Sequence, residues 1–182
     1  AQYEASVADN TITDILADYK IHPGDVFFLP AGRVHSIGAG SFIAEIQQTS
    51  NITYRIYDFN RRDANGNTRE LHTELAKDAI DYTVLPDYRT HYEPAQDTRV
   101  ELVSCPYFTT SLYDLTRPET LDLASLDSFV VAICIEGRGT LTDDSGAAVP
   151  VHQGETVLIP ASARSLAFTP DGGMKILTSW IG

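Results

Sequence analysis

The chain has 182 residues, of which 25 are acidic and 13 are basic, and its formal net charge at pH 7 is −12. This length accommodates one or two domains with a sizeable core, and the acidic charge argues against general binding to nucleic acid or to anionic membranes. Two cysteines, Cys105 and Cys134, lie far apart and predict free buried thiols. We expect a cytoplasmic protein, because no leader and no apolar run of about 18 residues is visible.

The first half of the chain combines two helix candidates with extended segments. Residues 11–18 place three apolar side chains on one face, which predicts a short helix. Residues 26–58 alternate short apolar runs with turn residues and predict strands. Residues 68–82 repeat apolar side chains at helical spacing, and Thr68 is positioned to cap that second helix.

The second half of the chain has strand patterning almost throughout. Residues 99–113 and 129–180 are rich in β-branched and aromatic side chains, which favour strands. Two clusters of Gly, Asp and Ser, at 136–139 and 143–146, predict the turns between these strands.

Residues 24–35, Gly-Asp-Val-Phe-Phe-Leu-Pro-Ala-Gly-Arg-Val-His, are the most informative stretch. Val26 to Leu29 have the pattern of a buried strand, Pro30 ends strand pairing, and Gly32 permits a tight turn. His35 then stands where a strand re-enters a barrel, and a neutral imidazole there is a good ligand for zinc. The spacing resembles the second metal motif of cupins, the small jelly-roll barrels.

The same phrase occurs twice, because residues 22–31 recur as residues 152–161. In this register the partner of His35 is Ser165, so we predict two related barrel units of which only the first keeps the ligand. The part from glycine to proline in each copy should form equivalent strands. The alternative is that this phrase is merely a common combination of strand and turn.

Three phrases carry a family resemblance: GDVFFLPAGRVHSIG, FIAEIQQTSNITYRIYDFNR and TRELHTELAKDAIDY. Through them residues 21–82 resemble type I phosphomannose isomerases (mannose-6-phosphate isomerases), especially the shorter bacterial branch, and ETVLIPASARSLAF looks like that family's C-terminal cupin-like unit. The expected fold is mainly β, with cupin-like jelly-roll units in two related halves and one or two short helices. Residues 1–95 would be the C-terminal part of the catalytic cupin unit with a helical segment, and residues 96–182 a cupin-like unit without metal ligands.

The resemblance implies a role in carbohydrate metabolism, the interconversion of mannose 6-phosphate and fructose 6-phosphate with a bound zinc. This reaction removes a proton next to a carbonyl through an enediol, so it needs a base and a group that stabilises the enediolate oxygen; a metal polarises the oxygens as a Lewis acid. His35 matches the family's last metal ligand, Arg55 matches the active-site arginine, and Glu45 matches a carboxylate of the same pocket.

Each of these residues also has a purely structural interpretation. Glu45 could be a surface carboxylate on a strand, and His35 an ordinary turn histidine. Arg55 could instead form a structural ion pair with Asp58 or Asp81.

The sequence provides only part of a cupin metal site. Such a site needs an earlier H-x-H or Q-x-H followed by a Glu, and the stretch before Gly24 contains His22 and Glu4 but neither motif. One histidine cannot hold zinc, which needs three or four protein ligands. We therefore expect the C-terminal part of a longer isomerase, inactive and without tight zinc on its own. Open sheet edges would favour self-association.

Two other function classes remain open. A cupin that has lost its metal could be a non-catalytic sugar-binding or interaction domain. A different cupin enzyme, such as a dioxygenase or an epimerase, is a further alternative, although a dioxygenase needs the absent H-x-H motif. Because fold likeness alone does not decide function, the phrase from Glu45 to Arg55 is what favours the isomerase.

Overall fold

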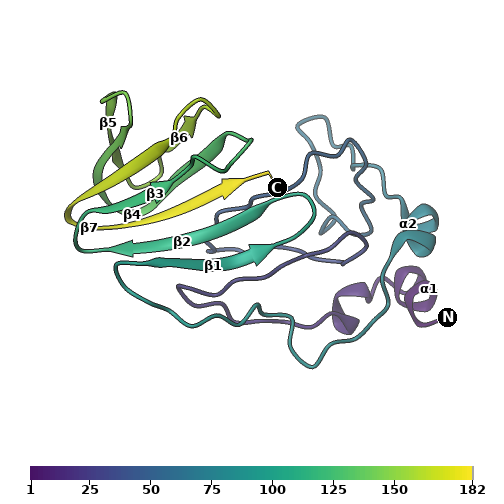
Figure 1. Cartoon of the computed structure of the whole chain (residues 1–182). Coiled ribbons are helices and arrows are strands. Elements are labelled where there is room, and N and C mark those ends of the chain that lie inside the picture. The colour runs from purple at the N-terminus through teal and green to yellow at the C-terminus, as the bar shows by residue number, and fades with distance from the viewer. Residues whose placement is uncertain (182) are drawn as a thin grey trace. The chain divides into compact units, whose positions relative to one another are not determined.

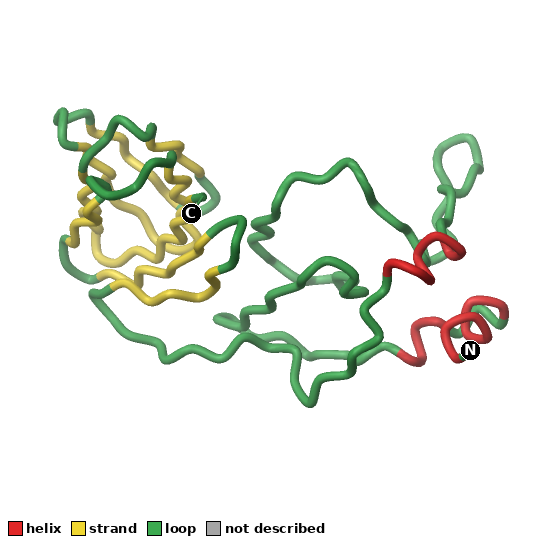
Figure 2. The backbone as a smooth tube through the Cα atoms, turned by 45° about the vertical axis from the view of Figure 1, so that its right-hand side comes forward, coloured by secondary structure: helices red, strands yellow, loops and turns green. Residues whose placement is uncertain are grey.

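The computed structural model describes residues 1–181, which divide into two compact units. Residues 1–42 and 49–88 form the first unit, and residues 43–48 together with the chain from Arg89 onward form the second. Helices are confined to the N-terminal part of the described chain and strands to the C-terminal part, as Figure 2 shows. The predicted fold class, mainly antiparallel β with two short helices, is confirmed.

The helical elements of the first unit are α1 (Gln2–Ala8), the 3-10 turn η1 (Ile12–Ile15) and α2 (Thr73–Ala79). The helix expected at 11–18 is only the short turn η1, and α1 precedes it. The second predicted helix is α2, which is shorter than expected because His72, and not Thr68, is its N-cap. Tyr3 links the two helices, because its hydroxyl donates to the Thr73 carbonyl at 2.9 Å.

The strands predicted within residues 26–58 are wrong, since no strand of the described chain begins before Arg99. Local sequence makes this segment extended and apolar, but a strand also needs a second backbone to pair with. The exposed fractions show the consequence. Phe28 and Leu29 are 40 % and 39 % exposed, whereas strand-forming apolar side chains normally pack into a core.

The repeated phrase nevertheless folds into the same turns in both copies. In each copy a histidine backbone N–H donates to a carboxylate three residues later at 2.9 Å, and that residue's N–H donates back to the histidine carbonyl at 3.0 Å. The intervening glycines have φ values of 94° and 93°. Both prolines also accept a turn hydrogen bond, at 3.1 and 3.0 Å. The residues are His22, Gly24, Asp25 and Pro30 in one copy and His152, Gly154, Glu155 and Pro160 in the other.

Two long strands organise the second unit (Figure 1). They are β4 (Val130–Asp143) and β7 (Ser165–Trp180), which pair antiparallel along nearly their whole lengths. The sheet order is β1-β2-β7-β4-β5, with β3 also paired to β7 and β6 also paired to β4. The remaining strands are β1 (Arg99–Ser104), β2 (Thr109–Leu115), β3 (Glu119–Asp122), β5 (Ala148–His152) and β6 (Thr156–Ile159).

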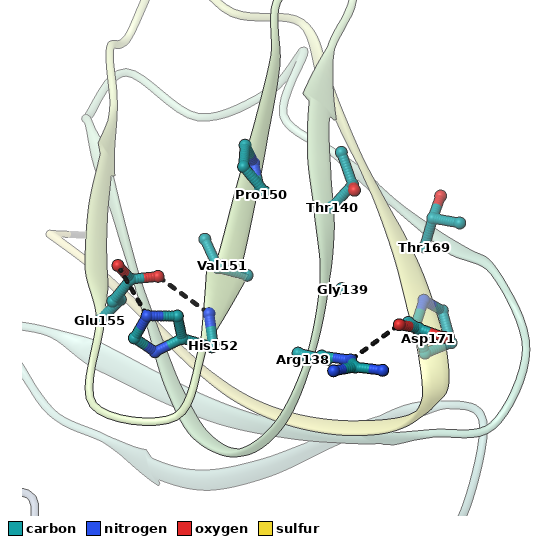
Figure 3. A pocket seen from close by; sticks show the side chains of 10 residues that line it. Arg138, Gly139, Thr140, Pro150, Val151, His152, Glu155, Thr169 and Asp171 are labelled. Atoms are coloured by element: carbon teal, nitrogen blue, oxygen red, sulfur yellow. Dashed lines mark hydrogen bonds and ion pairs between the residues drawn. The ribbon is translucent and has the colours of Figure 1, made fainter.

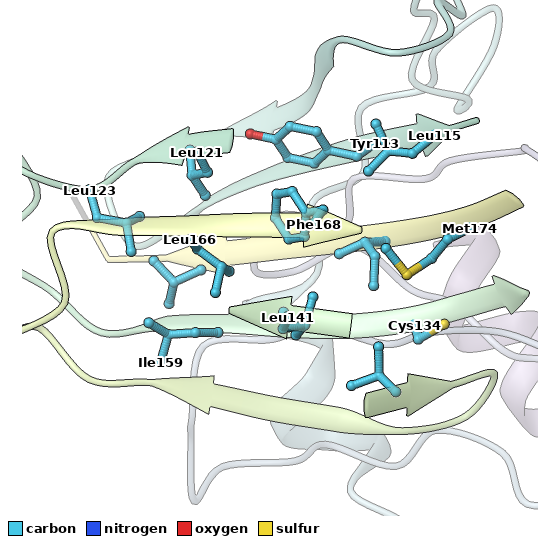
Figure 4. Close-up of a cluster of buried hydrophobic side chains, with 14 of the residues drawn as sticks. Tyr113, Leu115, Leu121, Leu123, Cys134, Leu141, Ile159, Leu166, Phe168 and Met174 are labelled. Atoms are coloured by element: carbon cyan, nitrogen blue, oxygen red, sulfur yellow. The ribbon is translucent and has the colours of Figure 1, made fainter. Parts of the chain in front are cut away.

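Each long strand belongs to both halves of the sheet. The first part of β4 pairs with β6 and its last part with β5, while the two parts of β7 pair with β3 and β2. The side chains between these strands form one buried apolar cluster, seen in Figure 4. Tyr113, Phe168 and Ile176 are among its members, and Phe168 is completely buried.

The turn predicted at 136–139 is wrong, because these residues continue β4 through two irregularities in its pairing with β7. Gly137 has a φ of 73°, and a Cβ there would lie 2.1 Å from the Gly173 carbonyl oxygen. The glycines therefore bend the strand and allow two backbones to approach each other. They do not reverse the chain direction, as a turn would. The turn predicted at 143–146 is confirmed, with the Gly146 N–H donating to the Asp143 carbonyl at 3.0 Å.

Both cysteines are free, as predicted. Cys134 is buried in the core, and this burial raises the pKa of its thiol, whereas Cys105 is half-buried. Among residues 1–181 no helix has the length and apolar character needed to span a membrane.

The close approach at Gly137 gives a stability prediction. Gly137→Ala should destabilise the protein by about 1–2 kcal/mol for its left-handed backbone and by a further ~1–3 kcal/mol for the clash with Gly173. Gly146→Ala is the matched control, because Gly146 has a φ of 84° and open space around it, and it should cost only the backbone term. Urea unfolding measures both. Equal losses of unfolding free energy would contradict the packing account.

Candidate functional site

The structure places the three predicted site residues in different surroundings. His35 and Arg55 belong to the first compact unit, while Glu45 belongs to the segment 43–48 that is part of the second. His35 and Glu45 are exposed, and Arg55 is half-buried.

The loop that carries His35 is clamped to the chain after α2. Asp81 donates its backbone N–H to the Gly32 carbonyl at 2.9 Å, and a Cβ on Gly32 would lie 2.7 Å from the Ala79 carbonyl oxygen. Gly32, with a φ of 86°, is therefore the residue that permits this close approach.

Arg33 fixes the same loop from its other side. Its guanidinium donates to the Asp81 carboxylate at 3.1 Å and to the Thr83 carbonyl at 3.0 Å, and it lies 4.8 Å from the ring centroid of Tyr88. Only 11 % of the Arg33 side chain is exposed. Hydrogen bonds from Thr83 and the Arg33 charge lower the pKa of Asp81, so this carboxylate stays ionised.

The ring of His35 is oriented by the backbone. Its Nδ1 lies 3.0 Å from the Arg33 carbonyl oxygen. Because a carbonyl only accepts, Nδ1 carries the proton in this contact, and the lone pair of the neutral ring is on Nε2. This is the tautomer in which histidines usually bind metals, with the second ring nitrogen hydrogen-bonded to a carbonyl or carboxylate.

A backbone clamp holds Arg55 against the start of α2. The Arg55 N–H donates to His72 Nδ1 at 3.2 Å, and the His72 N–H donates to the Arg55 carbonyl at 2.7 Å. The Arg55 guanidinium donates to the Glu70 carbonyl at 3.4 Å. His72, the N-cap of α2, therefore has a specific role that its position in the sequence did not reveal.

The alternative ion pairs considered for Arg55 are wrong. Asp81 pairs with Arg33, as described above. Asp58 is buried and binds two other guanidiniums, those of Arg61 and Arg69. Hydrogen bonds from Arg69 and Arg61 hold the pKa of Asp58 well below its usual range.

Sequence reasoning missed this cluster of Asp58, Arg61 and Arg69. One signal was available in the sequence, because Asn65-Gly66 is typical of a turn that brings the chain back on itself. The isolated bridge between Arg62 and Thr68 closes that loop and brings its two flanks together.

The described residues do not by themselves make a zinc site. Among residues 1–181 no three His, Cys, Asp or Glu side chains are grouped so that they could hold a metal ion. Zinc requires at least three protein ligands, so the donor set of this chain does not fit the metal alone.

A separate pocket of about 490 Å³ opens on the second unit, between inner parts of β4 and β7 and the end of β5 (Figure 3). Arg138 pairs with Asp171 at 2.7 Å on one side, and His152 pairs with Glu155 at 3.3 Å on the other. All four side chains are largely exposed. None of the predicted site residues His35, Glu45 and Arg55 lines this pocket.

Comparison with known proteins identifies related sequences and related structures. Residues 98–181 match the family model described as mannose-6-phosphate isomerase, cupin domain. The mannose-6-phosphate isomerase ManA of Bacillus subtilis is 36 % identical over 150 residues, which are 81 % of this chain and 46 % of that protein. The mannose-6-phosphate isomerase of Streptococcus mutans is 30 % identical over 167 residues, covering 91 % and 51 %.

The crystal structure of the mannose 6-phosphate isomerase from Bacillus subtilis superimposes with a TM-score of 0.59 and 26 % identity. The match covers 71 % of this chain and 40 % of that one. This chain therefore spans about half the length of the curated relatives that it matches.

The charge cluster at Asp58 predicts a specific response to acid. Because the pKa of Asp58 is lowered by folding, its ionised form stabilises the native state at neutral pH. This contribution is complete above the unfolded value of about 4 and is lost as pH falls toward the folded pKa. Asp58→Asn should lower the free energy of unfolding at pH 7, and the difference from the unmodified protein should shrink below about pH 4. Chemical denaturation at several pH values tests this; a difference independent of pH would contradict it.

Proposed function

Because this chain belongs to the mannose-6-phosphate isomerase family, with residues 98–181 matching its cupin domain, we propose that it is part of a cytoplasmic aldose–ketose isomerase. Its substrates would be mannose 6-phosphate and fructose 6-phosphate. Residues 1–95 would contribute part of the catalytic unit, and residues 96–182 a cupin-like unit that supports it.

The isomerisation moves a proton between neighbouring carbons through an enediol, so negative charge develops on an oxygen. Arg55 is suited to stabilise that charge. Both the backbone N–H and the backbone carbonyl of Arg55 form hydrogen bonds with His72. The Arg55 guanidinium donates to a backbone carbonyl, whereas the guanidiniums of Arg33 and Arg61 pair with carboxylates. Its positive charge is thus positioned but not neutralised by those contacts. This is the observation on which the proposal mainly rests.

His35 and Glu45 have supporting parts in the proposal. His35 would provide one metal ligand through Nε2, because Nδ1 is occupied by the Arg33 carbonyl. Glu45 would line the same sugar pocket as a carboxylate. Zinc, when bound, would supply Lewis-acid polarisation of the substrate oxygens. Since the described residues lack a group of three metal ligands, the other ligands and the base would come from protein beyond this sequence.

The runner-up function is a non-catalytic sugar-binding or interaction domain. The missing metal-ligand group among residues 1–181 is the observation that favours it. The two functions predict different results when the residues missing from the metal site are supplied. A binding domain keeps its sugar affinity in the presence of a chelator and gains no turnover when further residues are supplied.

The first experiment supplies the missing part. The 182-residue protein alone should hold no stoichiometric zinc after dialysis and show no turnover of mannose 6-phosphate in a coupled assay. A fusion with the portion of Bacillus subtilis ManA that this chain does not match should gain both zinc and turnover. Chelator-sensitive turnover by the unfused chain would contradict the proposed incompleteness. A well-folded fusion that binds sugar without turnover would favour the runner-up.

The second experiment tests Arg55 in the active fusion. Arg55→Ala should lower kcat by on the order of 10²–10³, because an electrostatic stabiliser acts mostly on the transition state. Arg62→Ala is the control; Arg62 is also in the first unit and contacts only a backbone carbonyl in its described hydrogen bond, at Gly66. The control should keep kcat within about twofold. An unchanged kcat in Arg55→Ala would remove this residue from the mechanism.

A further inference from the structure

The pocket on the second unit has the sheet itself as its floor (Figure 3). Thr140 of β4 lies opposite Pro150 of β5 on one side and opposite Thr169 of β7 on the other. Arg138, two residues earlier in β4, lies opposite His152. Because alternate side chains of a strand point to the same face, Arg138 and Thr140 share the face on which the pocket opens.

A bulge in β7 builds one wall of the pocket. Two consecutive residues of β4 lie opposite Gly173 and Pro170, so Asp171 and Gly172 are extra residues in β7. Gly172 has a φ of 82° and open space around it, so glycine serves the backbone conformation there and not packing. The bulge brings the Asp171 carboxylate to Arg138 Nε at 2.7 Å. Bulges that redirect a side chain in this way are common beside functional sites.

The turn after β5 builds the opposite wall. The Glu155 carboxylate accepts the His152 backbone N–H at 2.9 Å, and its other oxygen lies 3.3 Å from His152 Nε2. His152 Nδ1 lies 3.1 Å from the Gln153 carbonyl oxygen, so both ring nitrogens have partners. Gly154, with a φ of 93° and open space around it, permits this turn. Each wall therefore presents a carboxylate next to a nitrogen-bearing side chain.

The balance of charge in the pocket favours an uncharged ligand. Arg138 and His152 are each paired with a carboxylate, so no surplus positive charge is available to an anion. The net charge of −12 also repels anions at long range. A cation would lie beside the Arg138 guanidinium, and among residues 1–181 no three His, Cys, Asp or Glu side chains are grouped to hold a metal.

The polar groups of the pocket are suited to hydroxyl groups. Arg138 contacts Asp171 through Nε, and the N–H groups on its two Nη atoms are further donors. Thr140 and Thr169 add two hydroxyls to the lining. A sugar hydroxyl both donates and accepts, so it can accept from a guanidinium and donate to a carboxylate, and such charge-assisted hydrogen bonds are the stronger ones.

Two prolines in the lining favour a sugar over a peptide strand. β5 is an edge strand, and an exposed edge can pair with a further strand. Pro150 in the middle of β5 has no N–H, which weakens pairing along that edge. The rings of Pro150 and Pro170 instead give the pocket apolar surface, which suits the C–H groups of a sugar ring.

We propose that this pocket binds an uncharged carbohydrate. Arg138 donates to its hydroxyl oxygens, and the carboxylates of Asp171 and Glu155 accept from its hydroxyl groups. The volume of about 490 Å³ lies within the usual range of small-molecule sites, about 300–1,000 Å³. The proposal goes beyond the isomerase function, because it concerns the second unit alone and involves neither a metal nor any of the predicted site residues.

NMR of the isotope-labelled 182-residue chain tests the site by titration with mannose and mannotriose. Each sugar should saturably shift the backbone amide signals of the pocket residues in β4, β5 and β7, with a Kd on the order of 1 mM because the site is open. At least threefold tighter binding of mannotriose would identify an oligosaccharide as the ligand, and equal or weaker binding a single sugar. Absence of saturable shifts with both sugars, or shifts confined to the first unit, would overturn the proposal.

Variants separate the site from general charge effects. Arg138→Gln and Asp171→Asn should each weaken mannose binding about tenfold or more. Their side chains are 70 % and 68 % exposed, so the fold should persist, and the same spectra report it. Arg117→Gln is the matched control, because Arg117 is 72 % exposed and pairs with the Asp97 carboxylate in the same unit outside the pocket. It should change the affinity less than twofold. Equal weakening by the control would overturn the site.

Ionic probes test whether the ligand is uncharged. Acetate and methylammonium each present one charged group without sugar hydroxyls. Neither should saturably shift the pocket signals at concentrations that saturate mannose binding. Saturable binding of either ion in this range would overturn the assignment to an uncharged carbohydrate.

Discussion

The pairing of β4 with β7 is the interaction on which the rest of the second unit depends. It runs from Val130 opposite Trp180 to Asp143 opposite Leu166, and every other strand joins one of these two, except β1, which joins through β2. Both long strands bend where Gly137 meets Gly173, so that one ladder serves both halves of the sheet. The bend lets a single set of apolar side chains fill the space between the halves.

The two copies of the repeated phrase differ in whether a neighbouring strand is available for backbone pairing. Their turns are equivalent because a histidine, a glycine with positive φ and a carboxylate close them locally. In the second copy β6 then pairs with Val130–Ile133, and Ile159 is only 4 % exposed. In the first copy Leu29 occupies the corresponding position and is 39 % exposed. Turn chemistry is local, whereas strand formation needs a second backbone.

This difference explains how far sequence patterns predict the structure. Helix α2, the strands after Arg99 and the turn at Asp143 depend on nearby residues or on partners within the chain, and they were predictable. The strands expected at 26–58 did not form, because no strand pairing among residues 1–181 involves this segment. Gly137 was misassigned because a glycine that allows two strands to approach has the same sequence signal as one that reverses the chain. The candidate site follows the same rule. The motif indicated His35 and Arg55 as candidates, but the contact of His72 with Arg55 and that of Arg69 with Asp58 join residues 17 and 11 positions apart.

Hydrogen exchange of the backbone amides tests most directly whether partner availability separates the two copies. In the 182-residue chain, the β6 amides that pair with β4, within Thr156–Ile159, should exchange only through global unfolding of the second unit. The amides of Val26, Phe28 and Leu29 should exchange at rates close to those of an unstructured peptide, although the turns on either side are equivalent. Similar protection of the two segments would contradict this account, because it would show that the first copy has found a backbone partner of its own.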